Sequence, residues 1–571
     1  MATKMSENEK TPTTSESSNC LESEKKEDDA LQLKTSLKAG QDAYFKQTWT
    51  VSICLCIFMV ALSAGIACLL QKHPLFVERG LIRLHHYFSA VALNWRTPNR
   101  PNIDHDAFRY SLLWMAPFFS GGGYCSEAIS YVTAMETGSK GTSHIPKFAI
   151  SHHGDAENMN FWKGLPLATR QTLVSLSSTH IDLADAVVVC HSEPGAWYPP
   201  LYMTPPCPPT GYEHPLYVIG RTMFETDSVT PHHVDRCNKM DEVWVPTQFH
   251  IDTFTRAGIV PEKLVKVVQP VDTDFFNPAR LQPLRLPTTN RLFGLDAKPG
   301  LYSAQSSKPF VFLSIFKWEH RKGWDILLSA YLQEFSANDD VALYLLTNPY
   351  HSDRDFATVI TKFVLSRSIR EPPSGWPRVY LIDEHIPQSQ LPALYKAAAC
   401  FVLPSRGEGW GRPHVEAMAM ELPVIATNWS GMTEYMTELN SYPLQVERMS
   451  EVLEGPFKGH LWAEPSISHL MLLMRHVVVH PEEARQKGKV ARFDMMTKFS
   501  QEVVGRIVVE QLVRVQAKLD SRTSANKVSA TSRNDVCDCV LNKNDNAKAH
   551  TVASRRQSSC ANKKFSSVSP S

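Results

Sequence analysis

The chain has 571 residues, which at about 150 residues per domain is too long for one ordinary domain and suggests three or four units. Hydrophobic residues make up 43% and charged residues 20%, as in a globular protein, and a formal net charge of +1 gives no overall field that favours nucleic acid. The cysteines form no Cys-x-x-Cys pair and no Cys/His spacing typical of zinc, so neither a disulfide framework nor a metal site is expected.

The N-terminal part changes abruptly in composition. Residues 1–48 are polar and low in aromatic residues, and we expect them to be disordered. Residues 49–70, WTVSICLCIFMVALSAGIACLL, contain no charged side chain. At about 1.5 Å per residue this run crosses a hydrocarbon core of about 30 Å, so it is predicted to be a transmembrane helix. A buried core helix usually carries a polar stripe, and a cleaved signal peptide is shorter.

A stem is predicted over residues 71–100, followed by a first α/β domain over 101–285. The strand candidate 110–117 runs into Ser120-Gly121-Gly122-Gly123 and then into a helical stretch. Strand, glycine loop and helix form the opening unit of a Rossmann-like sheet. The remaining strand candidates, with helical stretches such as 169–184 between them, are 147–151, 186–190, 242–246 and 265–269.

A second α/β domain is predicted over residues 286–520, with a linker rich in Pro, Leu and Thr at roughly 277–308 around its start, and the end of the chain is expected to pack back on the first domain. Its strand candidates are 311–316, 342–347, 378–383, 400–405 and 423–427, and its helical stretches include 324–335, 391–399 and 414–421. Strands that alternate with helices imply parallel sheets, so the fold class is α/β with two Rossmann-like domains. Ligands bind at the carboxyl ends of such strands, here in a cleft between the domains. Residues 521–571, rich in Ser, Asn and Lys, are predicted to be a disordered tail.

The most informative stretch of the second domain is CFVLPSRGEGWGRPHVEAMAMELPVIATNWSGMTEYM, residues 400–436. A buried strand leads into a loop with glycines at 407, 409 and 411, and Pro413 suits the first turn of a helix. Glycines let a backbone approach a ligand closely, and a helix N-terminus suits a diphosphate. The carboxylates of Glu408 and Glu416 are poor partners for phosphate but good acceptors for paired sugar hydroxyls.

The pattern Glu408-x7-Glu416 within EGWGRPHVEAMAMELPVIAT resembles the donor motif of the family 4 glycosyltransferases, which have the GT-B fold. The resemblance implies that Glu416 holds the ribose hydroxyls of the nucleotide and that Glu408 lies beside the transferred sugar. It also implies that Gly409, Trp410 and Gly411 belong to the donor-binding loop.

A second segment, FLSIFKWEHRKGWDILLSAY (312–331), resembles the strand, loop and helix of the same family. The resemblance pairs Lys317 with Lys322, and lysines bind phosphate as point charges. The family commonly has Gly-Arg where Phe316-Lys317 stands, so this chain lacks a bidentate guanidinium at that place and its donor preference can differ.

The first domain carries weaker signals for the acceptor side. His191 follows the strand candidate 186–190 and resembles the family histidine that contacts the transferred sugar, so it is predicted to be catalytic together with Glu408. His153 and Asp155 follow another strand candidate and are expected to line the acceptor pocket, and Gly122 and Gly123 match the glycine loop near the acceptor. The whole resemblance covers roughly residues 110–510.

The resemblance implies a retaining transfer of a hexose-type sugar from a nucleotide-sugar donor, without a metal or another cofactor. The acceptor is a glycan, a lipid or a protein. Two alternatives stay open: a nucleotide-sugar epimerase of the same fold and a non-catalytic sugar-nucleotide-binding protein. A dinucleotide-dependent oxidoreductase is not favoured, because the first glycine loop lacks the G-x-G-x-x-G spacing.

The predicted span makes the protein a single-pass membrane protein of the Golgi or the endoplasmic reticulum. Lys34, Lys38 and Lys46 precede the span, and Lys72, Arg79 and Arg83 follow it, so the positive-inside rule does not choose an orientation. Analogy with many anchored sugar transferases favours a lumenal body. The sequon Asn428-Trp429-Ser430 favours a cytosolic one, because a glycan there would obstruct the donor site.

Overall fold

The structure of the protein is a computed structural model that describes residues 108–138, 145, 147–209, 214–295, 309–348, 355–382 and 386–541. The chain divides into two compact units, Met1–Ile103 and Asp104–Ser571, and every described residue lies in the second unit. Within these described ranges, no helix has the length and apolar character that a membrane crossing requires. The predicted tail 1–48, transmembrane span 49–70 and stem 71–100 lie outside them.

The first half is built on a parallel sheet with strand order β2-β1-β3-β4-β5-β6. Its strands are β1 (Ser111–Ala116), β2 (Phe148–His152), β3 (Ala186–His191), β4 (Tyr217–Arg221), β5 (Glu242–Val245) and β6 (Leu264–Lys266). The helices of this half are α3 (Gly123–Gly138), α4 (Met159–Gly164), α5 (Leu167–Ser177), α6 (Pro231–Lys239) and α7 (Gln248–Ala257). The strand order reverses at β1, so the loops after β1 and β3 lie at the topological switch point of the sheet.

The second half has a sheet with the order β13-β12-β11-β8-β9-β10-β7, parallel except for the edge strand β7. Its strands are β7 (Arg291–Phe293), β8 (Phe310–Lys317), β9 (Val341–Asn348), β10 (Arg378–Ile382), β11 (Cys400–Leu403), β12 (Val424–Thr427) and β13 (Tyr442–Leu444). Its helices are α8 (Trp324–Glu334), α9 (Phe356–Ser366), α10 (Leu391–Lys396), α11 (Arg412–Ala419), α12 (Ile467–Val479) and α13 (Pro481–Lys498). The switch point lies between β8 and β11, the strands that precede the two predicted donor segments.

The strands follow from short apolar runs that are buried on both faces. All six residues of β3, AVVVCH, are buried, and so are all four residues of β11, CFVL. Continuous burial is what a parallel sheet covered by helices requires. Several elements differ from the sequence prediction; for example, β4 was not expected, and β7 lies inside the predicted linker 277–308. Helix α5 ends at Ser177, whereas the helical stretch was predicted to continue to residue 184.

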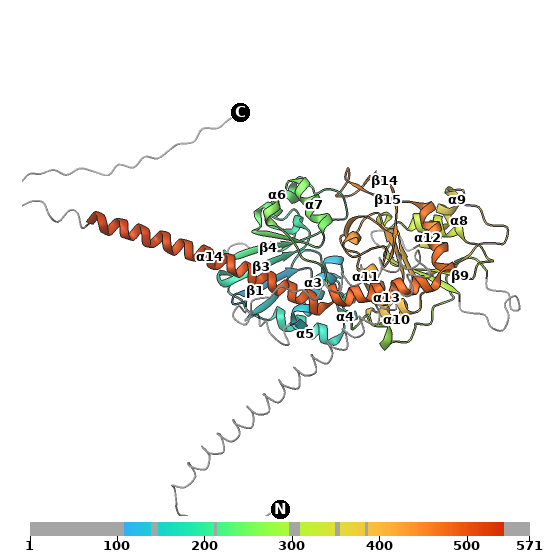
Figure 1. Ribbon diagram of the computed structural model, residues 1–571, viewed down its shortest axis with the longest axis horizontal. Helices are drawn as coiled ribbons and strands as arrows, with labels where there is room; N and C mark the ends of the chain where they lie inside the picture. Colours follow the sequence, from blue (N-terminus) through green and yellow to red (C-terminus); the bar gives the residue numbers. More distant parts are fainter. Residues whose placement is uncertain are drawn as a thin grey trace, which may run out of the picture. The chain divides into compact units, whose positions relative to one another are not determined.

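The last described helix, α14 (Gln501–Leu541), returns to the first half and packs along α3 (Figure 1). Its buried side chains recur at helical spacing on one face and belong to the same core as β1 and α3; they are Val504, Val508, Leu512, Val515 and Leu519. A Cβ on Gly505 would lie 2.5 Å from the Ala134 carbonyl oxygen, so the two helices meet closely there. The helix continues to Leu541, well into the segment predicted to be disordered from residue 521.

A hairpin of the second half, β14 (Val446–Glu451) and β15 (Leu461–Pro465), connects the two halves. The Asp227 backbone N–H donates to the Leu461 carbonyl at 3.0 Å, and the Leu461 N–H donates to the Asp227 carboxylate at 2.7 Å. A second contact joins Lys266 Nζ to the Glu434 carboxylate at 2.6 Å. These bonds hold the segment after β4 against the second half.

Cys190 and Cys207 form a disulfide, which corrects the expectation that the body contains none. The bond closes a loop with a sequence separation of 17 residues, from the end of β3 to a strand-like contact between Trp197 and Cys207. Sequence spacing could not reveal the pair, because the fold of this loop brings its two ends together. Cys125, Cys237 and Cys400 are buried and free.

We predict that Cys207→Ser lowers the free energy of unfolding by about 3 kcal/mol, because a closed loop of this length limits the unfolded chain. The measurement is denaturant unfolding of the purified full chain with and without dithiothreitol. The reductant should destabilise the wild type and leave the variant unchanged. A wild-type protein that is insensitive to reductant, with both thiols open to alkylation, would contradict the disulfide.

Candidate active site

The two predicted donor segments lie side by side at the switch point of the second sheet. The turn after β8 contains Gly323, with a φ of +67°. A Cβ on this residue would lie 2.0 Å from the Pro404 carbonyl oxygen in the loop after β11. The Arg406 N–H donates to the Arg321 carbonyl at 2.7 Å, and this bond joins the two loops directly. The Lys-Gly pair of the sequence is thus explained by the close approach of two loops.

Glu408 is the buried centre of the loop between β11 and α11, with 6% of its surface exposed. Lys322 Nζ donates to its two carboxylate oxygens at 2.8 and 2.9 Å, and Arg321 Nη1 donates to Oε2 at 3.2 Å. Burial opposes ionisation, but Lys322 and Arg321 outweigh it and lower the pKa of Glu408 to about 2. Glu408 is therefore an anion throughout the neutral pH range.

Arg321 is a site residue that the sequence analysis missed. Its guanidinium donates to the Gly407 carbonyl at 2.7 Å and to Glu319 at 3.1 Å, besides its bond to Glu408. The Glu225 carboxylate of the first half lies 3.9 Å away. The only sequence signal was its place beside Lys322 in the turn His320–Lys322, and the partners come from three separate segments.

The glycines of the donor loop serve contacts with the first half. A Cβ on Gly407 would lie 2.0 Å from the Glu225 carbonyl oxygen, and one on Gly409 would lie 2.6 Å from Met223 Sδ. The sequence pattern predicts that these glycines let the backbone approach a bound ligand closely. The structure instead places protein against both of them, on the segment that follows β4.

Arg406, in the same loop, holds it in place through buried ion pairs and was not predicted from the sequence. It is 2% exposed and forms ion pairs with Asp325 and Glu464, each at 2.8 Å. Its Nη1 also donates to the His320 carbonyl at 2.7 Å. The guanidinium therefore ties β15, the start of α8 and the turn after β8 to the donor loop.

Glu416 lies in α11, one helical turn beyond Arg412. Tyr395 donates to Glu416 Oε2 at 2.9 Å, and Arg412 Nε lies 3.8 Å from Oε1. Burial raises the pKa of Glu416, and the Arg412 charge and the Tyr395 hydrogen bond oppose that rise. The side chain is 13% exposed, which leaves part of the carboxylate accessible to a ligand.

Two polar groups at the start of α11 have no hydrogen-bond partner among the described residues. They are Trp410 Nε1 and His414 Nε2, in side chains that are 2% and 0% exposed. Burial lowers the pKa of His414 to about 4, and the Lys322 charge also disfavours its protonation. His414 is therefore neutral at neutral pH. Gly411 precedes this helix start in a left-handed conformation, with a φ of +92°.

Lys317 ends β8 and faces the first half. Burial lowers the pKa of Lys317, and the charges of Lys322 and Arg321 act in the same direction, whereas Asp155 opposes them. The pKa of Asp155 is raised because neighbouring atoms exclude part of its water and Glu193 repels its charge, while Lys317 counteracts the rise. The predicted acceptor-side carboxylate and the predicted phosphate-binding lysine are thus electrostatic neighbours.

His191 is placed differently from the prediction. It is fully buried, and its Nδ1 accepts a hydrogen bond from Trp114 Nε1 at 3.1 Å. Its Nε2 donates to Glu127 at 3.0 Å, and Arg221 also pairs with that carboxylate. Both ring nitrogens are occupied, so His191 cannot contact a sugar in this arrangement. Burial also lowers its pKa, which favours the neutral ring.

His153 is likewise an interior residue. It is 0% exposed, its Nδ1 bonds the Pro205 carbonyl at 2.7 Å, and its Nε2 bonds the Ser192 hydroxyl at 2.8 Å. It connects two loops and does not line a pocket. Asp155 is exposed, and a Cβ on Gly122 would lie 3.2 Å from its Oδ2. A Cβ on Gly123, the first residue of α3, would meet nothing within 4 Å.

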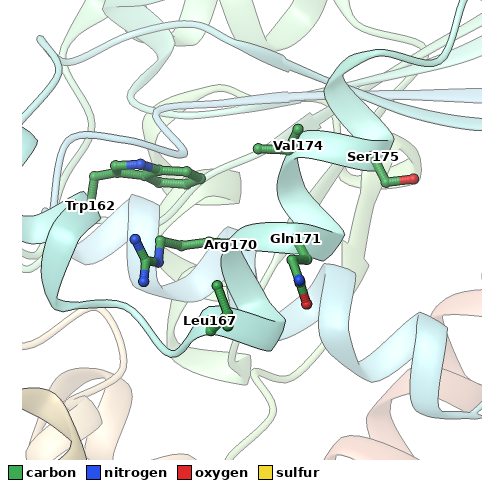
Figure 2. Close-up of a pocket in the computed structure, with 6 residues that line it drawn as sticks. All are labelled: Trp162, Leu167, Arg170, Gln171, Val174 and Ser175. Atoms are coloured by element: carbon green, nitrogen blue, oxygen red, sulfur yellow. The ribbon is translucent and has the colours of Figure 1, made fainter.

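An open pocket on the first half lies apart from these residues (Figure 2). It is lined by Trp162, Leu167, Arg170, Gln171, Val174 and Ser175, from α4 and α5. It contains none of the predicted site residues. Within the described ranges, no group of three or more His, Cys, Asp or Glu side chains is arranged to hold a metal ion. The expectation that the transfer requires no metal stays a prediction.

We predict that Lys322→Met lowers the free energy of unfolding at pH 7 by about 1–3 kcal/mol, because Glu408 stays buried with Arg321 as its main partner. Folding lowers the pKa of Glu408 from its usual 4.5 to about 2. Its contribution to stability is therefore present above pH 4.5 and disappears as the pH falls toward 2.

The check is denaturant unfolding of wild type and variant between pH 7 and pH 3. The difference between them should shrink as the pH falls. The matched control is Lys458→Met, at an exposed lysine. A pH-independent difference would contradict the Glu408–Lys322 pair.

The part of the chain that contains this site resembles known proteins. Residues 307–449 match the family model described as "Glycosyl transferases group 1". The matched segment runs from just before β8 into β14 and contains Lys317, Lys322, Glu408 and Glu416. Residues 307–449 resemble a group 1 glycosyl transferase.

Two curated relatives are mannosyltransferases by name. The chain is 35% identical over 103 residues to O-antigen chain mannosyltransferase B of Escherichia coli, covering 18% of this chain and 26% of the relative. It is 25% identical over 164 residues to the lipopolysaccharide core biosynthesis mannosyltransferase LpsB of Rhizobium meliloti (strain 1021), covering 27% and 44%. The chain thus spans less than half the length of these relatives.

Solved structures with likeness to the chain include Anabaena Alr3699/HepE in complex with UDP and glucose. It is 14% identical with a TM-score of 0.47, over 71% of this chain and 99% of that one. Sucrose-phosphate synthase from Thermosynechococcus elongatus is 13% identical with a TM-score of 0.46, over 72% and 100%.

Proposed function

We propose that the protein is a retaining glycosyltransferase of family 4 and GT-B fold that transfers a hexose-type sugar from a nucleotide-sugar donor. The observation on which this proposal mainly rests is the donor loop at the switch point of the second sheet. There Glu408 and Glu416 flank the start of α11, and Lys322 and Arg321 contact Glu408. The group 1 glycosyl transferase match over residues 307–449 supports the same reaction class.

In this proposal the donor lies along the start of α11. Its diphosphate binds near the helix N-terminus, where backbone N–H groups and the helix dipole favour an anion. Lys317 and Lys322 add positive charge. Glu416 accepts hydrogen bonds from the ribose hydroxyls, and Tyr395 and Arg412 fix the orientation of its carboxylate. The unpartnered nitrogens of Trp410 and His414 offer polar contacts at the same helix start.

Glu408 lies beside the transferred sugar and accepts hydrogen bonds from its hydroxyl groups. When the diphosphate binds, Lys322 exchanges part of its contact with Glu408 for a phosphate oxygen, and Arg321 keeps the carboxylate charged. An acceptor oxygen then forms a bond to the anomeric carbon. The bond from that carbon to the diphosphate oxygen breaks with its electron pair on the diphosphate, which also receives the hydroxyl proton. The two lysines stabilise the charge that develops on this leaving group.

His191 takes a positioning role in this scheme. It shares the Glu127 carboxylate with Arg221 and lies at the end of β3, where these bonds fix the start of the loop that follows this strand. We retain Glu408 as the residue that touches the transferred sugar and withdraw the direct sugar contact of His191.

We further propose that the body faces the lumen of the Golgi or the endoplasmic reticulum, anchored by the predicted span 49–70. The Cys190–Cys207 disulfide supports this side, because disulfides persist in oxidising compartments. The exposed Asn428 of the sequon weighs against this side, because a glycan there would obstruct the donor site. Isolation of the native chain with both thiols reduced would reject this orientation.

The donor assignment predicts that a nucleotide sugar raises the thermal stability of the full chain, because a ligand that binds only the folded state stabilises it. The probes are UDP- and GDP-hexoses. Glu416→Ala should abolish the thermal shift, because the ribose hydroxyls lose the carboxylate that accepts their hydrogen bonds. Glu438→Ala, at an exposed carboxylate, is the matched control. An unchanged shift in Glu416→Ala would reject the role of this residue.

The same preparation tests the reaction itself. A nuclear magnetic resonance spectrum of the product should show the anomeric configuration of the donor. Interconversion of the donor sugar without any acceptor would instead indicate an epimerase. Donor binding without turnover on saccharide, lipid and peptide acceptors would indicate a non-catalytic binding protein.

A further inference from the structure

The disulfide-closed loop of the first half, residues 190–207, is held firmly against the turn that follows β2. Thr204 Oγ1 accepts from the Gly154 N–H at 2.9 Å and donates to the Gly154 carbonyl at 3.2 Å. The Pro205 carbonyl bonds His153 Nδ1, and the Leu201 N–H donates to the Gly195 carbonyl at 2.7 Å. A disulfide and four hydrogen bonds therefore fix a short surface loop next to Asp155.

This fixed loop nevertheless presents large apolar and aromatic side chains to solvent. The exposed fractions are 50% for Tyr198, 52% for Leu201, 40% for Tyr202 and 102% for Met203. Four neighbouring exposed side chains of this kind differ from the scattered apolar residues of an ordinary surface, and such patches mark binding sites. Tyr and Trp rings also give large contact area at a low cost in conformational entropy.

One carboxylate lies within the loop and a second lies beside it. Glu193, in the loop, is held by His233 Nε2 at 3.1 Å, and a Cβ on Gly195 would lie 3.2 Å from Glu193 Oε1 and 3.5 Å from Leu201 Cδ1, so Glu193 and Leu201 lie close together. The pKa of the Tyr202 phenol is raised by burial and by the charges of Glu193 and Asp155. Tyr202 is therefore within electrostatic reach of both carboxylates.

The loop also borders the proposed donor site. Thr204 bonds Gly154, next to Asp155. Tyr124, at the start of α3, donates to the Met223 carbonyl at 2.9 Å, and a Cβ on Gly409 in the loop before α11 would lie 2.6 Å from Met223 Sδ. The loops after β1, β2 and β3 meet here, because Gly122 approaches Asp155 and His153 bonds Ser192. The exposed side chains are therefore placed where an acceptor would approach the donor.

We propose that residues 198–203, with Asp155 and Glu193, form the acceptor subsite, and that the acceptor is a carbohydrate. This inference rests on the proposed glycosyl transfer. The apolar face of a sugar ring packs on Tyr202 and its exposed neighbours, and its hydroxyl groups donate to the two carboxylates. A phosphate-bearing lipid carrier is disfavoured, because both carboxylates repel its headgroup. A peptide acceptor lacks the paired hydroxyls that two carboxylates can bind.

The test uses the purified full chain in detergent with Tyr202→Ala and Asp155→Asn. The acceptor probes are a panel of free mono- and oligosaccharides, a polyprenyl phosphate and a hydroxyl-containing peptide. Wild type should transfer to saccharides, and each variant should raise the acceptor KM roughly tenfold, which corresponds to about 1.4 kcal/mol of lost binding. Tyr202→Ala should keep the thermal shift with the nucleotide sugar, because this residue lies outside the loops that carry the proposed donor residues.

The matched control is Phe493→Ala, which removes an aromatic ring of 61% exposure from α13 and should leave the acceptor KM unchanged. Transfer only to the polyprenyl phosphate or only to the peptide would overturn the carbohydrate assignment. An unchanged saccharide KM in both variants, with a normal donor shift, would overturn the subsite alone. Absence of any donor shift in the wild type would instead reject the proposed function.

Discussion

The ion cluster around Glu408 is the interaction on which the arrangement of the candidate site depends. A carboxylate with 6% exposure stays charged only if cations lie against it, and Lys322 and Arg321 supply that charge at hydrogen-bond distance. Both cations come from the turn after β8, and the carboxylate comes from the loop after β11. The cluster therefore fixes two neighbouring strand ends relative to each other. Arg406, in the same loop as Glu408, forms a second set of buried ion pairs with Asp325 and Glu464.

This cluster also connects the two halves of the molecule. The Glu225 backbone packs on Gly407, and its side chain approaches Arg321, although Glu225 follows β4 in the first sheet. A larger residue at 407 or 409 would push this segment away. The hairpin β14–β15 holds the segment from its other end through Asp227. The donor loop is consequently shaped by the first half even where every predicted donor residue belongs to the second.

The sequence predicted the elements with continuous apolar runs and missed those defined by distant contacts. Strands such as 400–403 and 310–317 were placed to within a few residues, because burial on both faces leaves a run of large apolar side chains. The strand Tyr217–Arg221 was missed, since its Gly220 and Arg221 interrupt the run; a Cβ on Gly220 would lie 2.4 Å from the Trp197 ring. The site residues show the same difference. Lys322 and Glu408 stand in recognisable motifs, whereas the contact of Arg321 with Glu225 depends on tertiary packing and could not be predicted.

Two histidines predicted to be site residues, His191 and His153, show why a motif position does not by itself define a role. His191 and His153 both follow strand ends, as ligand-contacting residues do, yet each has both ring nitrogens occupied by protein groups. An imidazole whose Nδ1 accepts from an indole and whose Nε2 donates to a carboxylate is held neutral, and it has no nitrogen left for a substrate. What these residues do instead is fix the loops after β2 and β3. The side chains that we propose to meet an acceptor, Asp155, Glu193 and Tyr202, belong to these same two loops.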